Sequence, residues 1–441
     1  MRLHLYVHAR AALAIAAVAA CGGPAQLPLD ATTGPQPQLV APSHALVPMV
    51  RVAKATGWKE DDAPTAPQGL HVNAFARGLE HPRWLYVLPN GDVLVAESAG
   101  PRSATKPKGL RAWAFERFYK FAGSAVPSAD RITLLRDADG DGVAETRSIF
   151  LAGLHSPFGM ALVGDMLYVG NTDALVRVPY AAGDRQARGA PQRVTTLPAE
   201  PFNQHWTRNL LASPDGSKLY VAVGSASNVG EHGLDAEVER AAIWEVDLRD
   251  GSHRIFASGL RNPVGMAWIP ASDSQAPALW AAVNERDELG SDLAPDYMTH
   301  VRDGGFYGWP YTYWGAQVDT RVTPQRPDLV ARTIVPDYAL GAHTASLGLA
   351  YSDGDALSPH FGSGVFVGQH GSWNRSPPSG YRVVFIPFRD GRPQGEPVDV
   401  LTGFLSRDRS EARGRPVGVV LDGRGGLLVA DDVGNTVWRV R

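Results

Sequence analysis

Histidine, arginine and asparagine side chains recur at one position along this sequence, just before a series of apolar segments. Arg261 and Asn262, for example, precede the segment "PVGMAW". A guanidinium at the start of a core strand is costly to desolvate unless a partner meets it, and arginine suits a planar carboxylate through paired hydrogen bonds. Such side chains precede all six apolar segments: His81, Arg83, His155, His205, Arg208, Arg261, Asn262, His343, Arg413 and Arg415.

His205 is the candidate for proton transfer among these residues. It lies in "FNQHWTR", beside aromatic side chains and close to Arg208. A neutral histidine accepts a proton near neutral pH, and neighbouring cations help to keep it neutral. The alternative is a histidine that makes only structural hydrogen bonds in the core, which is the more common situation in proteins.

A separate acidic cluster lies in "RDADGDGVAET". Asp137, Asp139, Asp141 and Glu145 place several carboxylates on one tight turn, a ligand set that suits calcium. Ser148 stands where an EF-hand loop has its bidentate glutamate, and the turn lies between expected strands, so this is not an EF-hand. A calcium ion bound there would be structural, and the alternative is an exposed acidic hairpin turn.

The elements that position these side chains form a repeat. Each copy has an apolar strand, a turn containing Asp, Gly or Pro, and a second apolar strand, which is a hairpin signal. Repeated strand units close radially into a β-propeller, which removes exposed sheet edges. We therefore predict an all-β, six-bladed β-propeller of four-stranded antiparallel blades over residues 67–441, with "TVWRVR" completing a blade together with N-terminal strands. The copies are residues 81–97, 156–171, 207–224, 262–285, 345–369 and 415–432.

The innermost strands of a propeller line its central channel, so the residues before them are expected to converge at one mouth. Crowded cations repel one another and favour an anion among them, which predicts an anion-binding ring. Taken singly, each such residue more often caps a carbonyl or meets a local aspartate. Two insertions interrupt the repeat: residues 108–122, expected to form a short amphipathic helix, and residues 286–316, expected to form a long loop.

The N-terminal residues are typical of an export signal. Residues 1–21 combine basic residues, the apolar stretch "AALAIAAVAA" and the single cysteine, Cys21. Val18-Ala19-Ala20-Cys21 resembles a bacterial lipobox, which predicts a periplasmic or outer-membrane lipoprotein of the cell envelope anchored through Cys21. The alternative is an ordinary signal peptide cleaved nearby. Residues 22–66 are rich in Pro and Ala and lack periodicity, so we expect a disordered tether there.

Composition and missing motifs exclude several classes of function. A formal net charge of −3 gives no basic surface for nucleic acid. No cysteine follows Cys21, so disulfides, thiol catalysis and thiolate metal sites are excluded. The sequence contains no P-loop, H-E-x-x-H helix or G-x-S-x-G elbow, and no glycine motif for dinucleotides after a strand, which disfavours oxidation with a nicotinamide.

Four segments together resemble the soluble pyrroloquinoline quinone (PQQ)-dependent sugar dehydrogenases, most closely the sorbosone dehydrogenase-like or aldose sugar dehydrogenase branch. These segments are "HWTRNLLASPDGSKLYV", "GLRNPVGMAW", "DELGSDLAPDYM…DGGFYGWP" and "RGRPVGVVLDGRGGLLVADD", and the resemblance covers most of residues 67–441. The family is a six-bladed propeller that binds PQQ, a flat tricarboxylate, and calcium at the channel mouth. The resemblance implies oxidation of an aldose or related sugar aldehyde, glucose- or sorbosone-like, by hydride transfer to PQQ, with electrons passed to an external quinone or cytochrome.

The resemblance also implies roles for individual residues. His205 matches the family's general base, and Arg261 and Asn262 match the pair on the quinone side of the cofactor. Backbone carbonyls in residues 288–292 would hold the cofactor's calcium, a Lewis acid. The remaining implied contacts are Arg413 and Arg415 with the cofactor carboxylates, and Leu289 and Gly290 with calcium. The ring at the strand starts adds Arg208 and His155 as candidate cofactor contacts.

Three positions depart from the family pattern. Gln204 replaces an acidic residue before the base, and Phe158 stands near the position of a family glutamine. A family lysine that binds the cofactor carboxylates is missing from "VGQHGSWNRSPPSGYR", where Arg375 is the candidate substitute, beside His370 and Arg382.

Two other classes of propeller remain as alternatives. A propeller hydrolase or lactonase would use a channel metal to activate water and would need Glu, Asp and Asn ligands at the strand starts, where this sequence has His and Arg. A non-catalytic binding propeller would present loops only, and nothing in such a scaffold requires His205 and several arginines at one phase of the repeat.

Overall fold

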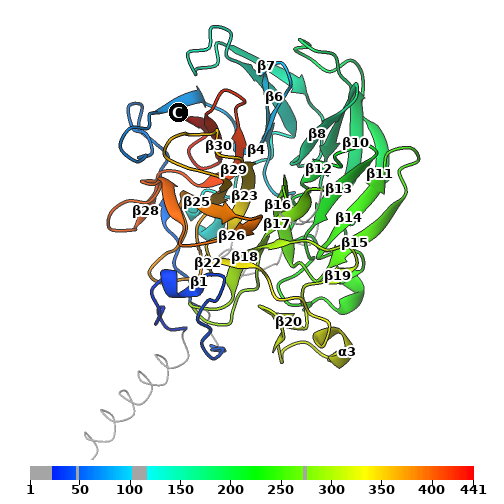
Figure 1. Cartoon of the computed structure of the whole chain (residues 1–441), viewed down its shortest axis with the longest axis vertical. Coiled ribbons are helices and arrows are strands. Elements are labelled where there is room, and N and C mark those ends of the chain that lie inside the picture. The colour runs from blue at the N-terminus through cyan, green and yellow to red at the C-terminus, as the bar shows by residue number, and fades with distance from the viewer. Residues whose placement is uncertain (1–21, 46–48, 102–116, 272–275) are drawn as a thin grey trace, which may run out of the picture.

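The computed structural model describes residues 22–45, 49–101, 117–271 and 276–441. Most of its strands form six antiparallel sheets that follow one another around the molecule in chain order, from blue through green to red (Figure 1). This arrangement confirms the predicted six-bladed β-propeller. The first three blades are β4 (Pro82–Val87), β5 (Val93–Glu97), β6 (Arg131–Arg136) and β7 (Thr146–Leu151); β8 (Met160–Val163), β9 (Met166–Gly170), β10 (Ala174–Pro179) and β11 (Gln192–Thr196); and β12 (Leu210–Ala212), β13 (Lys218–Val223), β14 (Ala242–Asp247) and β15 (His253–Ser258).

The last blade closes the ring by joining the two ends of the propeller chain. Antiparallel pairing of β3 with β31 completes that blade, as "TVWRVR" predicted. The last three blades are β16 (Asn262–Ile269), β17 (Ala278–Asn284), β18 (Pro295–His300) and β22 (Tyr338–Ala342); β23 (Ser346–Ser352), β24 (Gly364–Gln369), β25 (Arg382–Arg389) and β27 (Val398–Leu401); and β29 (Pro416–Leu421), β30 (Leu427–Asp431), β31 (Thr436–Val440) and β3 (Val72–Arg77).

Short elements occupy the loops between these strands. They are η1 (Asp30–Thr32), β1 (Thr33–Gly34), β2 (Lys54–Ala55), η2 (Leu234–Glu237), β19 (Gly305–Phe306), β20 (Thr312–Tyr313), β21 (Gln317–Val318), α3 (Pro327–Val330), β26 (Arg392–Pro393) and β28 (Glu411–Ala412). Residues 117–121 are helical, and the rest of the helix expected over residues 108–122 lies outside the described residues, except residue 122.

The first strand of each blade lines the channel and packs against the first strands of both neighbouring blades. Glycine in the repeat permits this close approach. A Cβ on Gly265 of β16 would lie 2.6 Å from Leu347 O of β23, and Gly159 has the same relation to Leu210 of β12. A glycine follows the His and Arg positions by three to five residues in four of the six copies, at Gly159, Gly265, Gly348 and Gly418, and it is a packing signal that fixes these inner strands and the residues at their starts.

Two sequence expectations about loops are wrong. Residues 286–316 are not one long loop, because β18 within them is the buried third strand of the fourth blade. The described residues of the expected tether, 22–45 and 49–66, lie on the propeller: β1 pairs with β22 and β2 pairs with β28. Backbone pairing of this kind needs no amphipathic periodicity. The side chains that do pack on the propeller, such as Trp58 against Trp438 and the buried Ala53, are isolated in sequence, so no periodic pattern reveals them.

Candidate active site

The candidate site lies at the end of the blades where first strands begin and second strands end. Antiparallel pairing brings these ends together, as Asn262 of β16 pairs with Asn284 of β17 and Pro82 of β4 pairs with Glu97 of β5. Each blade therefore places polar residues from two strands at one channel mouth. The first-strand starts predict only one of these two sets, because a polar residue also recurs at the end of each second strand or within two residues after it. These missed residues are Glu97, Asn171, Ser225, Glu285, Gln369 and Asp432.

His205 is held in its neutral form at this mouth. Its Nδ1 lies 3.1 Å from Ser225 O and 2.8 Å from Ser225 Oγ. Ser225 Oγ donates its own hydrogen to Ser227 O at 2.6 Å, so Nδ1–H donates to Ser225 and the lone pair is on Nε2. Burial, reinforced by the charge of Arg261, holds the pKa of His205 well below its usual range.

Arg261 lies beside His205, but its guanidinium is bound by protein groups. Nε donates to Asn228 O at 3.1 Å, Nη2 donates to Asn228 Oδ1 at 2.9 Å, and Nη1 donates to Glu285 O at 2.7 Å. Nη2 also lies 3.3 Å from the carboxylate of Asp287. Arg261 was expected to face a ring of His, Arg and Asn side chains that binds an anion, whereas carbonyl, amide and carboxylate groups of the protein meet its guanidinium. Its charge acts instead on the neighbouring His205 and Asp287.

Asn262 faces His205 across Gly224. A Cβ on Gly224 would lie 2.5 Å from Asn262 Oδ1 and 2.5 Å from His205 Cβ, so only glycine leaves room for this arrangement. Asn262 Oδ1 is buried and has no hydrogen-bond partner within the protein. Buried polar atoms are nearly always satisfied, so this oxygen marks a place for a bound ligand.

Asp287 connects three cationic or amide side chains, and sequence reasoning missed it. Its carboxylate accepts from Asn374 Nδ2 at 2.8 Å and pairs with Arg261 and with His343 Nδ1, the latter at 3.5 Å. His343 Nε2 donates to Gly290 O at 2.9 Å, so both ring nitrogens of His343 face acceptors. Burial opposes the charged form of His343, but the carboxylate of Asp287 raises its pKa above the ordinary value.

A second cluster surrounds Asp432 on the opposite side of the mouth. Asp432 accepts from Arg83 and, at 2.9 Å, from His370 Nε2, and it lies 3.5 Å from His81 Nε2. Burial lowers the pKa of His370 to about 4. The positive charges of Arg415 and Arg83 also lower this pKa, whereas the carboxylate of Asp432 opposes the shift. The pairs show that Asp432, which sequence reasoning missed, neutralises part of the expected cationic ring.

Arg83 and Arg415 are the cations of this cluster that keep hydrogen-bonding capacity. Arg415 Nη2 donates to the hydroxyl of Tyr381 at 2.7 Å, and the Nε atoms of both arginines are buried without a partner. Arg83 also lies 5.6 Å from the ring centroid of Trp206, the residue after His205. The aromatic ring therefore connects the two clusters across the mouth. Phe158, which stands near a family glutamine position, is fully buried and packs 4.8 Å from Trp84.

Three predicted cofactor contacts lie away from this cluster. Arg208 is fully buried, and its guanidinium donates to the carbonyl oxygens of His205, Thr207 and Pro198, so it supports the loop that carries His205. Burial lowers its pKa to about 9. His155 is exposed and pairs with Asp173 at 3.1 Å. Arg413 is exposed, as is Gln204. Sequence position alone could not distinguish these roles.

Arg375 and the loop after β17 bind the N-terminal segment. Arg375 Nη2 donates to Leu27 O at 3.0 Å and lies 3.4 Å from Asp292, which accepts from Gln26 N at 2.6 Å and from Leu27 N at 3.2 Å. Ser43 N donates to Leu289 O at 2.9 Å, and Gly290 O accepts from His343. Arg375 thus anchors this segment and is not placed as the substitute for the missing lysine. Leu289 and Gly290 use one lone pair of each carbonyl oxygen in these bonds, and a second remains.

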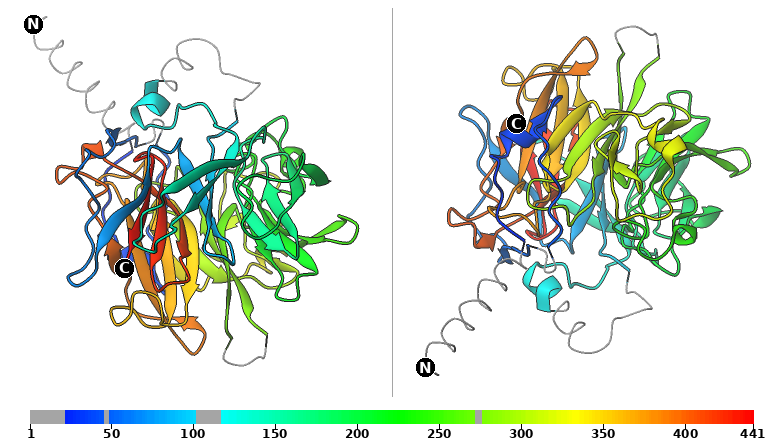
Figure 2. Two further views of the ribbon diagram at one scale, coloured as in Figure 1. Left: turned by 90° about the horizontal axis from the view of Figure 1, so that it is seen from above. Right: turned by 90° about the horizontal axis from the view of Figure 1, so that it is seen from below.

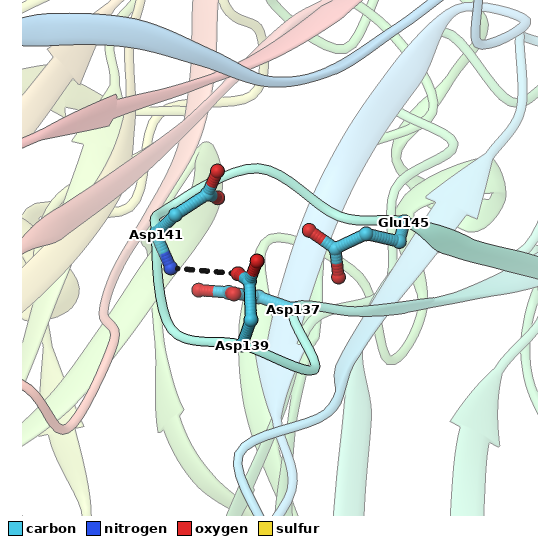
Figure 3. A group of neighbouring side chains, drawn as sticks. All are labelled: Asp137, Asp139, Asp141 and Glu145. Atoms are coloured by element: carbon cyan, nitrogen blue, oxygen red, sulfur yellow. Dashed lines mark hydrogen bonds between the residues drawn. The ribbon is translucent and has the colours of Figure 1, made fainter.

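The acidic turn does converge, at the other end of its blade. One ligand atom each from Asp137, Asp139, Asp141 and Glu145 lies within 4.8 Å of the others (Figure 3). Because β5 ends at the mouth and β6 runs back from it, the β6–β7 turn lies at the opposite end from the mouth. Arg424 of the last blade, which is the neighbouring blade across the ring closure, lies 3.2 Å from Asp137 and supplies one compensating charge.

Comparison of the sequence with known proteins identifies a family. The family model described as TrAA12-like matches residues 131–301 and 315–441. An uncharacterized protein of Borreliella burgdorferi is 27% identical over 310 residues, which cover 68% of this chain and 79% of that protein. A pyrroloquinoline quinone-dependent pyranose dehydrogenase of Coprinopsis cinerea is 25% identical over 293 residues, which cover 54% of this chain and 39% of that longer protein.

Solved structures share the fold at low identity. The holo PQQ domain of the Coprinopsis cinerea pyranose dehydrogenase superposes with a TM-score of 0.68 at 20% identity, covering 89% of this chain and 100% of that one. The calcium structure of a Trichoderma reesei family AA12 enzyme gives 0.67 at 18% identity, covering 89% and 98%. The PQQ-bound aldose sugar dehydrogenase of Streptomyces coelicolor gives 0.53 at 18% identity, covering 86% and 99%. The chain therefore belongs to the TrAA12-like family, and the resemblance to the PQQ-dependent sugar dehydrogenases is confirmed at the level of family and fold.

Proposed function

We propose that this protein is a PQQ-dependent dehydrogenase that oxidises an aldose or related sugar aldehyde, glucose- or sorbosone-like, and passes the electrons to an external quinone or cytochrome. The observation that carries the proposal is His205. Its Nδ1–H is fixed by Ser225, its depressed pKa keeps it neutral, and it stands across Gly224 from the unpartnered Asn262 Oδ1.

The residues present fit a flat anionic cofactor. Arg83 and Arg415 each have a buried Nε without a partner, and Asn262 has a buried acceptor without one. A ligand that brings both acceptors and a donor would satisfy all three. Asp432 compensates part of the charge when no anion is present. Arg83, Arg415 and Asn262 are thus the side chains that would hold the cofactor, and Leu289 and Gly290 would offer carbonyl oxygens to its calcium.

The chain's own residues would orient the sugar and move one proton. Bound PQQ would supply the two-electron acceptor chemistry. Nε2 of His205 would take the proton from the sugar hydroxyl as the C–H bond breaks. Arg261 would stay paired with Asp287 and Asn228, and its charge would keep His205 deprotonated before turnover.

The alternatives are less well supported by the described residues. Within the parts of the chain that the structure describes, the one group of at least three His, Asp or Glu with convergent ligand atoms is the acidic turn, far from the mouth. Glu285, Asp287 and Asp432 do face the mouth region, but each contacts an arginine. A hydrolase or lactonase with a channel metal would need these carboxylates as ligands, and a binding propeller would not need a base.

Cofactor titration followed by turnover tests the proposal. Purified protein would be mixed with PQQ and calcium, and binding followed by cofactor absorbance, before dye reduction is measured with a panel of aldoses. His205→Ala should bind PQQ with unchanged affinity and lose about a hundredfold or more in kcat. His155→Ala is the matched control, because His155 is an exposed mouth histidine paired with Asp173, and it should keep full activity. No PQQ binding at micromolar concentration would exclude the dehydrogenase.

We further propose that the protein is exported as a lipoprotein of the periplasm or outer membrane, acylated on Cys21. In the described residues no helix is long and apolar enough to cross a membrane, and residues 1–21 lie outside them. Incorporation of labelled palmitate into the wild type but not into Cys21→Ser tests the anchor, and equal labelling would contradict it.

A further inference from the structure

Two buried arginines at the mouth end of the third blade pair with no carboxylate among the described residues. Arg208 is fully buried, and Arg240, two residues before β14, is 5% exposed. Another buried arginine without a carboxylate, Arg415, is one of the proposed cofactor contacts. A buried guanidinium without a counter-charge is costly, so Arg208 and Arg240 indicate a missing anion. The other buried arginines of the described residues each pair with an aspartate, and they are Arg83, Arg261, Arg286, Arg375 and Arg439.

The two guanidiniums meet at one neutral oxygen. Arg208 Nη2 donates to Asn203 Oδ1 at 3.0 Å, and Arg240 Nη1 donates to the same atom at 3.1 Å. Asn203 Nδ2 donates to Thr172 Oγ1 at 2.7 Å, and that hydroxyl donates to Trp206 O at 2.9 Å. The amide is therefore oriented with its oxygen toward both arginines. It brings no negative charge, so two like charges lie side by side without compensation.

Each guanidinium also keeps a buried N–H group without an acceptor, at Nε of Arg208 and at Nη2 of Arg240. Burial and the charge of Arg240 lower the pKa of Arg208 to about 9, which still leaves Arg208 charged at neutral pH. Buried donors are nearly always satisfied. A water molecule would accept hydrogen bonds here but leave both charges uncompensated, whereas an anion would supply the acceptor and the charge together.

The carboxylates that act on these arginines from farther away bind other groups or face solvent. Glu237 accepts from Ala226 N at 2.7 Å. Asp173 pairs with His155 at 3.1 Å, and Glu200 is exposed. Since none of these carboxylates accepts from either arginine, the two unpartnered N–H groups remain available for a ligand.

The two arginines connect two loops at the mouth end of the propeller. Asn203 and His205 lie in the loop between β11 and β12, and Arg240 lies near the end of the loop between β13 and β14. β12 contacts β8 of the second blade, and Figure 2 shows the second and third blades side by side, in blue-green and green, in both views. Asn203 is partly exposed, so a small ion can reach this place from solvent.

We propose that an anion of the halide class binds where the guanidiniums of Arg208 and Arg240 meet beside Asn203. Both unpartnered N–H groups are buried, which favours a small ion, and a monatomic anion accepts hydrogen bonds from any direction. The bound ion joins the loop that carries His205 to the loop before β14 and stabilises both. The inference goes beyond the dehydrogenase activity and is independent of it, because neither PQQ nor the sugar takes part.

Diffraction from crystals of the full chain grown with bromide in place of chloride tests the site directly. Anomalous scattering should show a bromide ion within hydrogen-bond distance of Arg208 Nε and Arg240 Nη2, and crystals of Arg240→Gln should lack it. A water molecule or no density at these atoms would overturn the proposal. Loss of the bromide when PQQ is added would also overturn it, because the arginines would then belong to the cofactor site.

Thermal stability at constant ionic strength gives a second measurement. Replacing methanesulfonate by chloride should raise the Tm of the wild type by roughly 2 to 4 °C at a chloride concentration a hundred times the dissociation constant. Arg240→Gln should lose this rise. Asn203→Asp places a carboxylate at the shared oxygen, so it should be more stable than the wild type in methanesulfonate and should no longer respond to chloride.

Arg249→Gln is the control, because Arg249 is exposed and pairs with Asp247 at 2.7 Å, and this variant should respond to chloride as the wild type does. Equal responses of the wild type, Arg240→Gln and Asn203→Asp would contradict the anion site. Asn203→Asp keeps both arginines, so it decides the question even where Arg240→Gln does not fold. Neither measurement uses dye reduction or sugar oxidation, so a failure of the proposed dehydrogenase is distinguishable from a failure of the anion site.

Discussion

At the scale of single residues, the tautomer of His205 is the most consequential feature of the site. Ser225→Ala removes the hydroxyl that accepts from Nδ1 at 2.8 Å but leaves the carbonyl oxygen at 3.1 Å. Losing one such hydrogen bond is worth about 1 kcal/mol, so kcat should fall by about fivefold. Steady-state kinetics with saturating PQQ would measure this, and the dissociation constant of PQQ should not change. A fall in PQQ affinity with normal kcat would instead place Ser225 in cofactor binding.

The pH dependence of turnover follows from the environment of His205. Burial and the charge of Arg261 lower its pKa, and the base works only when deprotonated, so activity is retained as pH falls through 6.5 and is lost only further into acid. Arg261→Gln removes the charge and should move the acid limb of kcat/KM to higher pH. His155→Gln, the control at a histidine far from Arg261, should leave the limb in place. An acid limb at or above pH 6.5 in the wild type would contradict the assignment.

Sequence reasoning at this scale placed the proposed base and part of the proposed ligand set at the mouth, and missed the counter-charges. His205, Asn262 and Arg415 lie at the mouth as the repeat phase predicted. Asp287 and Asp432 were missed because only first-strand starts were compared, although "VNERD" and "VADD" end their second strands with acidic residues. Arg208 satisfies three backbone carbonyls, and no local pattern distinguishes such an arginine from one that binds the cofactor.

At the scale of elements, the end of β13 sets the distance between His205, the proposed base, and Asn262. Gly224→Ala places a methyl group 2.5 Å from both Asn262 Oδ1 and His205 Cβ, so one of these side chains must move. We expect activity to fall by about tenfold or more with little loss of thermal stability, because the displaced groups lie at a strand end rather than in the core. Gly362→Ala is the control, since a Cβ there meets no atom within 4 Å. Full activity of Gly224→Ala would show that this spacing does not matter.

The repeat predicted the strands whose burial dictates a hydrophobic pattern in the sequence. It did not predict the elements that are held mainly by polar or backbone contacts. All six hairpins and the closing strand could be predicted, because inner strands must be apolar on both faces and each needs a turn. β18 was missed, since "PDYMTH" mixes polar residues into a buried strand whose Asp296 accepts from Glu285 N at 2.9 Å. The N-terminal segment was missed because Asp292 and Arg375 hold it through backbone groups, which leave no trace in hydrophobic periodicity.

At the scale of the whole molecule, the acidic turn lies where two blades meet near the closure of the ring. Arg424 of the last blade pairs with Asp137, and Asn73 Nδ2 of β3 donates to Gly142 O at 2.6 Å. β3 and β31 are the strands that join the two ends of the propeller. A calcium ion among Asp137, Asp139, Asp141 and Glu145 would therefore stabilise the closing blade against opening, and not the catalytic mouth.

Calcium should accordingly raise the thermal stability of the protein through this turn. Asp139→Asn keeps the acceptor for Asp141 N, 3.1 Å away, but removes one charge from the ligand set, so it should lose most of the stabilisation. At a calcium concentration a hundred times the dissociation constant, binding contributes about 2.7 kcal/mol to the free energy of unfolding, which corresponds to a rise in Tm of roughly 2 to 4 °C.

Calcium bound at the mouth would affect the wild type and the variant equally, so the difference between their Tm shifts reports the turn alone. Asp250→Asn, in the exposed turn where Ser252 N donates to Asp250 at 2.9 Å, should shift with calcium as the wild type does. Equal shifts for wild type and Asp139→Asn would mean that Arg424 already compensates the turn and that it works as a solvated hairpin.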